Sequence, residues 1–172
     1  MKREENGIPV ETERKWLIKM PSETALLALG AERDDIVQTY LRGVGSARVR
    51  QRKRADGTRL YTYTKKTALS QLSSVEEERE IDENEYRRLL GEADGRLSPI
   101  VKVRYTLPYG THRLEIDVYP FWRRVAVLEI ELPSEDAPVT LPPFLEVLRE
   151  VSGDRRLKNR ALAECIPDEN SL

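Results

Sequence analysis

The stretch Val10-Glu-Thr-Glu-Arg-Lys-Trp-Leu-Ile18 places a charged side chain at every second position, at Glu11, Glu13 and Lys15. Side chains two residues apart lie on the same face of a β-strand, so this stretch predicts a strand with one charged face. An edge strand would turn that face to water. In the alternative, the charged face points toward a charged partner. The rest of the sequence distinguishes an edge strand from this second arrangement.

The composition is that of a folded protein with many charges to place. The 172 residues are 39% hydrophobic and 34% charged, and we expect a single domain over 1–172 with a core over about 10–165 and short tails at both ends. Lys and Arg number 29 and Asp and Glu 30, which gives a net charge of -1. Domains that hold nucleic acid by bulk electrostatics are usually strongly basic, so this balance argues against a nucleic-acid partner.

Cysteine usage and hydropathy indicate a cytoplasmic protein. Cys165 is the only cysteine, so neither an internal disulfide nor a thiolate metal site can form. The first residues, Met1-Lys-Arg-Glu-Glu-Asn-Gly7, lack the apolar run of a signal peptide. No segment has the roughly 18 apolar residues that a membrane span needs, so we expect no membrane partner. The chain is compatible with a homodimer.

Short alternating segments separated by turn residues predict a mainly β protein. Asp56-Gly57 and Pro108-Tyr-Gly110 are turn signals. Weaker helical signals follow Pro21-Ser22 and Asp82, and run through the apolar stripe 144–151 and the segment 157–165. The predicted strands cover 10–18, 37–42, 47–54, 59–66, 75–81, 99–107, 111–119 and 124–133. Eight short strands with few helices favour an antiparallel sheet that closes into a barrel with flanking helices.

The same alternation of charged and apolar residues recurs in at least six of these strands. One charged face in a sheet is usually solvated, but these faces are almost purely ionised and carry both signs. If the sheet closes, the charged face becomes the inside of the barrel. Such an interior would be costly if empty, because unpaired charges lose hydration there. It suits a polyanion bound with metal, since Arg and Lys bind phosphate oxygens and carboxylates bind Mg²⁺ or Mn²⁺.

Glu11-Thr-Glu13-Arg-Lys15 resembles the ExExK signature of the CYTH superfamily, the triphosphate tunnel metalloenzymes. The resemblance runs over about 10–165, because further segments match in order: Ala47-Arg48-Val-Arg50, Thr64-Lys-Lys66, Glu78-Arg-Glu80-Ile81, Lys102-Val-Arg104-Tyr105, Leu114-Glu115-Ile-Asp117, Leu128-Glu129-Ile-Glu131 and Asp154-Arg-Arg156-Leu-Lys158-Asn159. Lys66 is chosen over Lys65 because it shares a polar face with Thr62 and Thr64.

The resemblance implies an eight-stranded tunnel that binds a small-molecule triphosphate together with Mg²⁺ or Mn²⁺. It implies that four glutamates bind metal or position the attacking water: Glu11, Glu13, Glu129 and Glu131. A second acidic group would bind another metal or support the basic residues: Glu78, Glu80, Glu115 and Asp117. The implied phosphate-binding residues are Lys15, Arg48, Arg50, Lys66, Lys102, Arg104, Arg156 and Lys158, with Arg52 and Arg113 as further candidates on the same faces.

Several reactions occur in the family that the sequence resembles. Hydrolysis of inorganic triphosphate is the first choice, because the short chain and the bare ExExK start resemble bacterial tripolyphosphatases. A class IV-type adenylate cyclase and a thiamine or nucleoside triphosphatase are the enzymatic alternatives. A non-enzymatic module that binds polyphosphate or triphosphorylated ends is a third, which the intact acidic set argues against.

Overall fold

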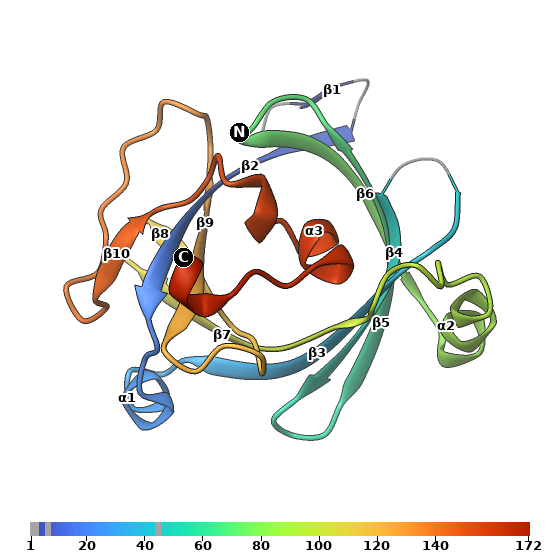
Figure 1. The fold of residues 1–172 in the computed structure, drawn as a ribbon, viewed down its shortest axis with the longest axis horizontal. Helices are drawn as coiled ribbons and strands as arrows, with labels where there is room; N and C mark the ends of the chain where they lie inside the picture. Colours follow the sequence, from blue (N-terminus) through green and yellow to red (C-terminus); the bar gives the residue numbers. More distant parts are fainter. Residues whose placement is uncertain (1–3, 6–7, 44–45) are drawn as a thin grey trace.

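The computed structural model describes residues 4–5, 8–43 and 46–172, and its strands form a closed barrel (Figure 1). Within that part of the chain, eight antiparallel strands follow one another around the barrel: β2 (Ile8–Lys19), β6 (Ser73–Ile81), β5 (Arg59–Ala68), β4 (Ser46–Arg54), β3 (Glu32–Tyr40), β7 (Ile100–Tyr109), β8 (His112–Val118) and β9 (Val125–Leu132). β9 pairs back along β2, from Leu132 opposite Thr12 to Val125 opposite Lys19, which closes the sheet. The predicted mainly β fold with a closed eight-stranded barrel is confirmed.

The tight turns lie where the sequence places them. Gly57 has a φ of 87° between β4 and β5, and the Thr58 amide donates to the Asp56 side chain over 2.8 Å. Gly110 has a φ of 58° between β7 and β8. Only glycine adopts such backbone angles without strain, so these two residues fix the register of both hairpins.

The strand β3 differs from its predicted range, since it begins at Glu32 and not at Val37. Its first residues, Glu32-Arg-Asp-Asp35, are polar and lack the apolar alternation that predicts a strand. They are nevertheless paired on both sides, because Asp34 lies opposite Arg54 of β4 and opposite Arg104 of β7. Pairing with two neighbours therefore extends the strand where local composition favours a loop.

On one side of the barrel, α1 (Glu23–Ala28) and the segment that leads into β10 (Val147–Glu150) pack against the outer surface. Trp16, Ile18 and Leu128 belong to the core on this side, together with Leu26 of α1 and Leu145. The prediction of a helix over the apolar stripe 144–151 is wrong. β10 pairs instead with the edge of β2 that β6 leaves free, with Val147 opposite Ile18. A short strand β1 (Glu4–Glu5) also pairs with β2.

On another side, α2 (Glu83–Leu90) packs against the outer surface of the barrel. The Asp82 side chain accepts a hydrogen bond from the Glu85 amide over 2.7 Å, which confirms it as the N-cap of this helix. Tyr86 and Leu89 pack with Val49 and Ile81 on the outside of the barrel. No helix in the described residues is long and apolar enough to cross a membrane.

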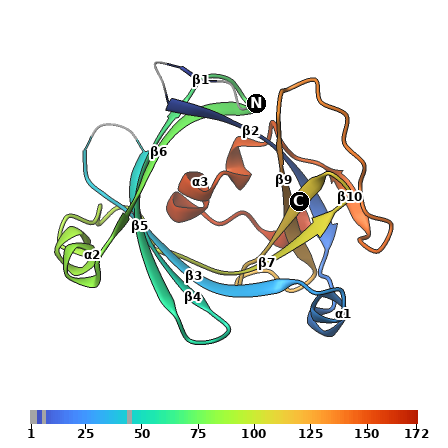
Figure 2. The same cartoon turned by 180° about the vertical axis from the view of Figure 1, so that it is seen from behind.

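The C-terminal segment plugs one end of the barrel. It consists of the turn η1 (Arg155–Leu157), the helix α3 (Asn159–Glu164) and the turn η2 (Glu169–Ser171). Both views show α3 inside the outline of the barrel (Figures 1 and 2). Leu157 and Leu162 are buried against Leu17, Tyr40 and Tyr119, which belong to the barrel strands and the end of β8. The predicted last helix is therefore shorter than 157–165 and starts after a 3-10 turn.

Candidate active site

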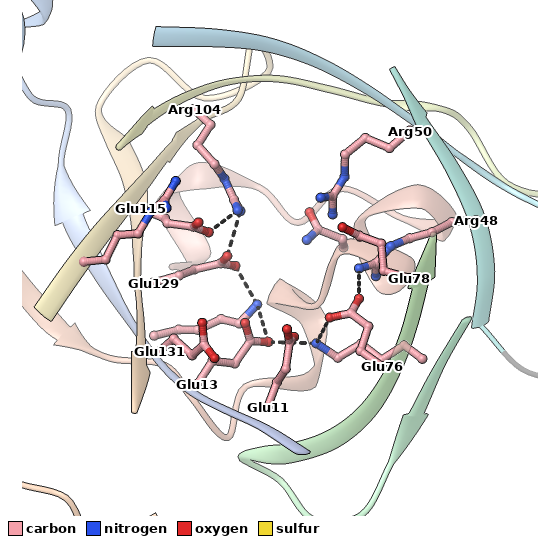
Figure 3. Close-up of a pocket in the computed structure, with 14 residues that line it drawn as sticks. Glu11, Glu13, Arg48, Arg50, Glu76, Glu78, Arg104, Glu115, Glu129 and Glu131 are labelled. Atoms are coloured by element: carbon pink, nitrogen blue, oxygen red, sulfur yellow. Dashed lines mark hydrogen bonds and ion pairs between the residues drawn. The ribbon is translucent and has the colours of Figure 1, made fainter. Parts of the chain in front are cut away.

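The strand register collects the charged faces on the inside of the barrel. Lys15 of β2 lies opposite Glu129 of β9, which in turn lies opposite Glu115 of β8. These strands surround a cavity of about 190 Å³. Its lining contains seven carboxylates, six cationic side chains and one amide: Glu11, Glu13, Lys15, Arg48, Arg50, Lys66, Glu76, Glu78, Arg104, Arg113, Glu115, Glu129, Glu131 and Asn159 (Figure 3).

A continuous belt of ion pairs runs along the wall of this cavity (Figure 3). Arg104 pairs with Glu115 and, over 2.8 Å, with Glu129, which accepts from Lys15 over 2.6 Å. Lys15 and Lys66 both lie 3.4 Å from Glu13, and Lys66 lies 3.9 Å from Glu76, which pairs with Arg48. The ion-pair belt therefore consists, in order, of Glu115, Arg104, Glu129, Lys15, Glu13, Lys66, Glu76 and Arg48.

Lys102 and Asp117 lie behind the belt and not in the cavity lining. Both side chains are fully buried and pair with each other. Asp117 also accepts two hydrogen bonds from Arg104, over 2.6 and 2.7 Å. This bidentate contact fixes the plane of the Arg104 guanidinium. The structure thus places Asp117 where it orients Arg104, and Lys102 where it pairs with Asp117.

The pKa shifts follow from burial and from these partners. Burial disfavours the charged form of Lys15, but Glu129 and Glu13 outweigh it and raise the Lys15 pKa. A hydrogen bond to Glu76, then burial and the Glu76 charge, raise the pKa of Glu11 to about 8. Burial opposes ionisation of Glu76, yet Glu11 as a donor and Arg48 as a cation lower the Glu76 pKa to about 2.

The register decides between the two lysines at the end of β5. Lys66 lies opposite Glu76 on the inner face, whereas Lys65 lies opposite Glu77 on the outer face. Thr64 is also on the inner face, where its hydroxyl donates to Glu78 over 2.8 Å. The structure therefore brings Lys66, and not Lys65, to the cavity.

The remaining predicted residues lie farther from the cavity. Arg156 is exposed and pairs with Asp154 over 2.8 Å, and Glu80 is exposed outside the cavity lining. Arg52 pairs with Asp34 on the inner face. Lys158 lines a second cavity, of about 580 Å³. That cavity shares five lining residues with the first: Glu13, Lys15, Arg48, Lys66 and Asn159.

Three residues of the site are absent from the predicted set. Glu76 lies on the charged face of its strand. The alternation along that strand is the signal by which it could have been included in the predicted set. Asn159 follows Lys158 in the C-terminal motif, and its side chain accepts a hydrogen bond from the Tyr119 hydroxyl over 2.8 Å. Gln38 is uncharged, so the charge pattern carries no sign of it, although it contacts Arg50.

The donor set suits a hard divalent cation. Glu11 and Glu13 on β2 and Glu129 and Glu131 on the neighbouring β9 supply carboxylate oxygens, the ligands that Mg²⁺ and Mn²⁺ prefer. The described residues contain no ready-made group of three acidic, His or Cys side chains around a metal position. Mg²⁺ usually takes one or two carboxylates and completes its shell with water and substrate phosphates, so the set fits that mode of binding.

A solved structure described as the hypothetical protein NE1496 is 30% identical to this chain, with a TM-score of 0.56. The match covers 91% of this chain and 99% of that one. The chain belongs to the CYTH superfamily of triphosphate tunnel metalloenzymes. A second structure, described as the inorganic triphosphatase NE1496, is 29% identical over 92% of this chain and 97% of that chain, with a TM-score of 0.54.

The barrel of this CYTH protein also resembles that of a more distant solved structure. The PH1819 protein from Pyrococcus horikoshii is 16% identical over 73% of this chain and 80% of that one, with a TM-score of 0.52. At that identity the similarity concerns the barrel alone. No protein-family model matches the sequence, and no match was found among curated proteins.

Proposed function

We propose that this CYTH protein hydrolyses the terminal phosphate of a triphosphate with the help of Mg²⁺ or Mn²⁺, and that inorganic triphosphate is its substrate. The observation that carries the proposal is the cavity enclosed by the barrel, whose lining is almost entirely ionised and carries both signs. The similarity of the chain to the structure described as an inorganic triphosphatase supports the choice of inorganic triphosphate as the substrate.

The charge balance of the cavity supports a role for a divalent cation. Seven carboxylates face six cationic side chains, so the lining by itself has no excess of positive charge for a polyanion. The raised pKa of Glu11, caused mainly by its neighbour Glu76 and by burial, indicates that two carboxyls already crowd each other. A divalent cation would add the missing positive charge, and when bound it lowers the pKa of a water molecule and polarises a phosphoryl oxygen.

The residues of the chain divide into two roles in this proposal. Glu11, Glu13, Glu129 and Glu131 would hold the cation and the attacking water, with Glu78 and Glu115 in support. Lys15, Lys66 and Arg104 hold their carboxylate partners in place and present their remaining donors to phosphate oxygens. The buried Nε of Arg48 has no hydrogen-bond partner in the described residues, so it also has a donor for a phosphate.

Nucleoside and thiamine triphosphates are the second candidate substrates. The cavity of about 580 Å³ adjoins the phosphate cavity and has room for an organic group. The order of substrate preference is tested with a panel of four compounds, each with Mg²⁺ or Mn²⁺: tripolyphosphate, ATP, thiamine triphosphate and pyrophosphate. We expect phosphate release to be fastest from tripolyphosphate. Cyclic AMP as the main product from ATP would identify a cyclase instead.

Glu11→Ala and Glu131→Ala should each lower kcat by about 100-fold or more, because they remove carboxylates proposed to act on water or metal. The matched control is Glu77→Ala, which removes an exposed carboxylate from the outer face of β6. Binding of tripolyphosphate without any turnover in the native protein would point to a binding module.

Removal of the metal should abolish turnover and leave the fold intact. The walls of the cavity are held by ion pairs between side chains, which need no cation to form. Excess chelator should therefore stop phosphate release, the circular dichroism spectrum should stay unchanged, and added Mg²⁺ or Mn²⁺ should restore the activity. Full turnover in excess chelator would refute the role of the metal.

A further inference from the structure

Arg50 lines the cavity but does not belong to the ion-pair belt. The other buried or half-buried cations of the lining pair with carboxylates, and Arg113 is exposed. Arg50 is half-buried, and within the described residues its guanidinium has no carboxylate within 4 Å. Figure 3 shows it directed into the cavity with no ion pair to the residues drawn there. Burial and the charges of Arg48 and Arg104 lower the Arg50 pKa, and they outweigh the charges of Glu78 and Glu76, which act in the opposite direction.

A neutral amide holds Arg50 where a carboxylate would neutralise it. Gln38 of β3 lies opposite Arg50 of β4, and its Oε1 accepts from Nε and Nη2 of Arg50 over 3.3 and 3.1 Å. Gln38 is fully buried, and its Nε2 donates to the Tyr40 hydroxyl over 3.0 Å. Arginine can only donate, so the oxygen of Gln38 must face it, and the contact with Tyr40 fixes the other half of the amide.

This arrangement leaves Arg50 without an ion pair in the described residues, so its guanidinium is available to an anionic ligand. The neighbouring inner positions use carboxylates for the same task, since Asp34 of β3 holds Arg52 and Glu76 holds Arg48. A carboxylate at position 38 would form the same two hydrogen bonds but would cancel the charge. We propose that Gln38 is a positioning residue that orients Arg50 and keeps it uncompensated, so that Arg50 is the part of the wall that binds a triphosphate before any metal is present.

The test is the isosteric change Gln38→Glu, matched by Gln51→Glu on β4. Gln51 lies opposite Val37 and Tyr61 on the outer face, so the control makes the same change in net charge away from the cavity. Tripolyphosphate binding is measured by calorimetry in chelator, and steady-state kinetics are measured with Mg²⁺. We expect Gln38→Glu to weaken binding and raise KM by about tenfold or more, with a smaller change in kcat, since one charged contact is lost. Gln51→Glu should leave both unchanged.

A second measurement separates this inference from the proposed function on which it rests. In the absence of ligand, Gln38→Glu should melt at a higher temperature than Gln38→Leu, because the carboxylate still accepts from Arg50 whereas leucine leaves Arg50 without an acceptor. If the native protein neither binds nor hydrolyses triphosphates, the proposed function fails while this stability order still holds. If the native protein binds tripolyphosphate and Gln38→Glu binds it equally well, the role of Gln38 is refuted.

Discussion

Arg104 connects three carboxylates of the barrel wall. It contacts Asp117 through two hydrogen bonds and also pairs with Glu115 and Glu129. Two of these carboxylates belong to β8 and one to β9, so a single guanidinium holds two strands at the wall of the cavity. A buried pair adds little net stability over an apolar core, but the loss of one partner leaves an uncompensated charge.

Replacement of Arg104 by Met should therefore destabilise the protein. It leaves the buried Asp117 with Lys102 as its remaining ion-pair partner, and it removes one partner of Glu129. We expect the free energy of unfolding to fall by about 3–5 kcal/mol. Urea denaturation of both proteins in metal-free buffer measures the change.

The matched control is Arg113→Met, which removes an exposed guanidinium from the same cavity lining. Its effect on unfolding should stay within about 0.5 kcal/mol. Equal losses in the two variants would show that the buried network is not what stabilises this wall.

At the scale of elements, the C-terminal segment closes one end of the barrel and contributes residues to both cavities. α3 has only six residues, too few to be stable alone in water, so its structure depends on packing in the mouth of the barrel. Leu157, Leu162 and Ala163 supply that packing, and the hydrogen bond from Tyr119 to Asn159 adds a polar contact. The segment also carries Lys158 and Asn159 to the two cavities, so docking and site assembly are linked.

Leu162→Ala should loosen this plug. Leu162 is 1% exposed, and truncating a buried leucine costs about 2–5 kcal/mol. Thermal unfolding measures the loss. Leu27→Ala, at a position of α1 that is 44% exposed, is the control and should change stability by about 0.5 kcal/mol or less. A loss in Leu162→Ala no greater than in the control would mean that the plug contributes nothing to the stability of the barrel.

At the scale of the whole molecule, the buried carboxylates make stability depend on acid pH. Burial raises the pKa of Glu129, but Lys15 and Arg104 lower it well below its usual value, and the pKa of Glu76 is lowered from 4.5 to about 2. A carboxyl whose pKa is lower in the folded state contributes stability above its unfolded pKa and loses it as pH falls through the folded value. Folding stability should therefore decline between about pH 4.5 and 2. The raised pKa of Glu11, about 8, has the opposite sign, because its contribution to stability is complete below about pH 4.5 and is lost as the pH rises to 8.

Urea denaturation from pH 4.5 to 3 in chelator follows the acid decline, because Glu11 no longer changes its protonation there. Glu76→Gln should flatten the pH dependence, because it removes one carboxyl with a lowered pKa. Glu77→Gln, on the outer face of the same strand, should leave it as in the native protein. Stability that stays constant down to pH 3 would contradict the role of the ion-pair belt in folding.

The local pattern along the chain was sufficient to predict the eight barrel strands, except for the polar first residues of β3. Alternation at Glu11, Glu13 and Lys15 predicts both the strand and its charged face, and Asp56-Gly57 predicts the turn, because each depends on residues that are neighbours in sequence. The same rule places Lys66 on the inner face. It failed at 144–151, where the free edge of β2 imposes a strand on a stripe with helical spacing.

The tertiary structure decided which charges meet. Sequence alternation assigns Lys102, Asp117 and Arg104 to one face, but only the closed barrel buries the first two and leaves the third at the cavity. In the tertiary structure, Arg156 also lies at the surface, and Arg50 contacts the side-chain amide of Gln38. The line of charges from Glu11 to Lys15 is thus set by strand periodicity, a local property. Their partners are set by barrel closure, which brings β9 beside β2 from more than a hundred residues away.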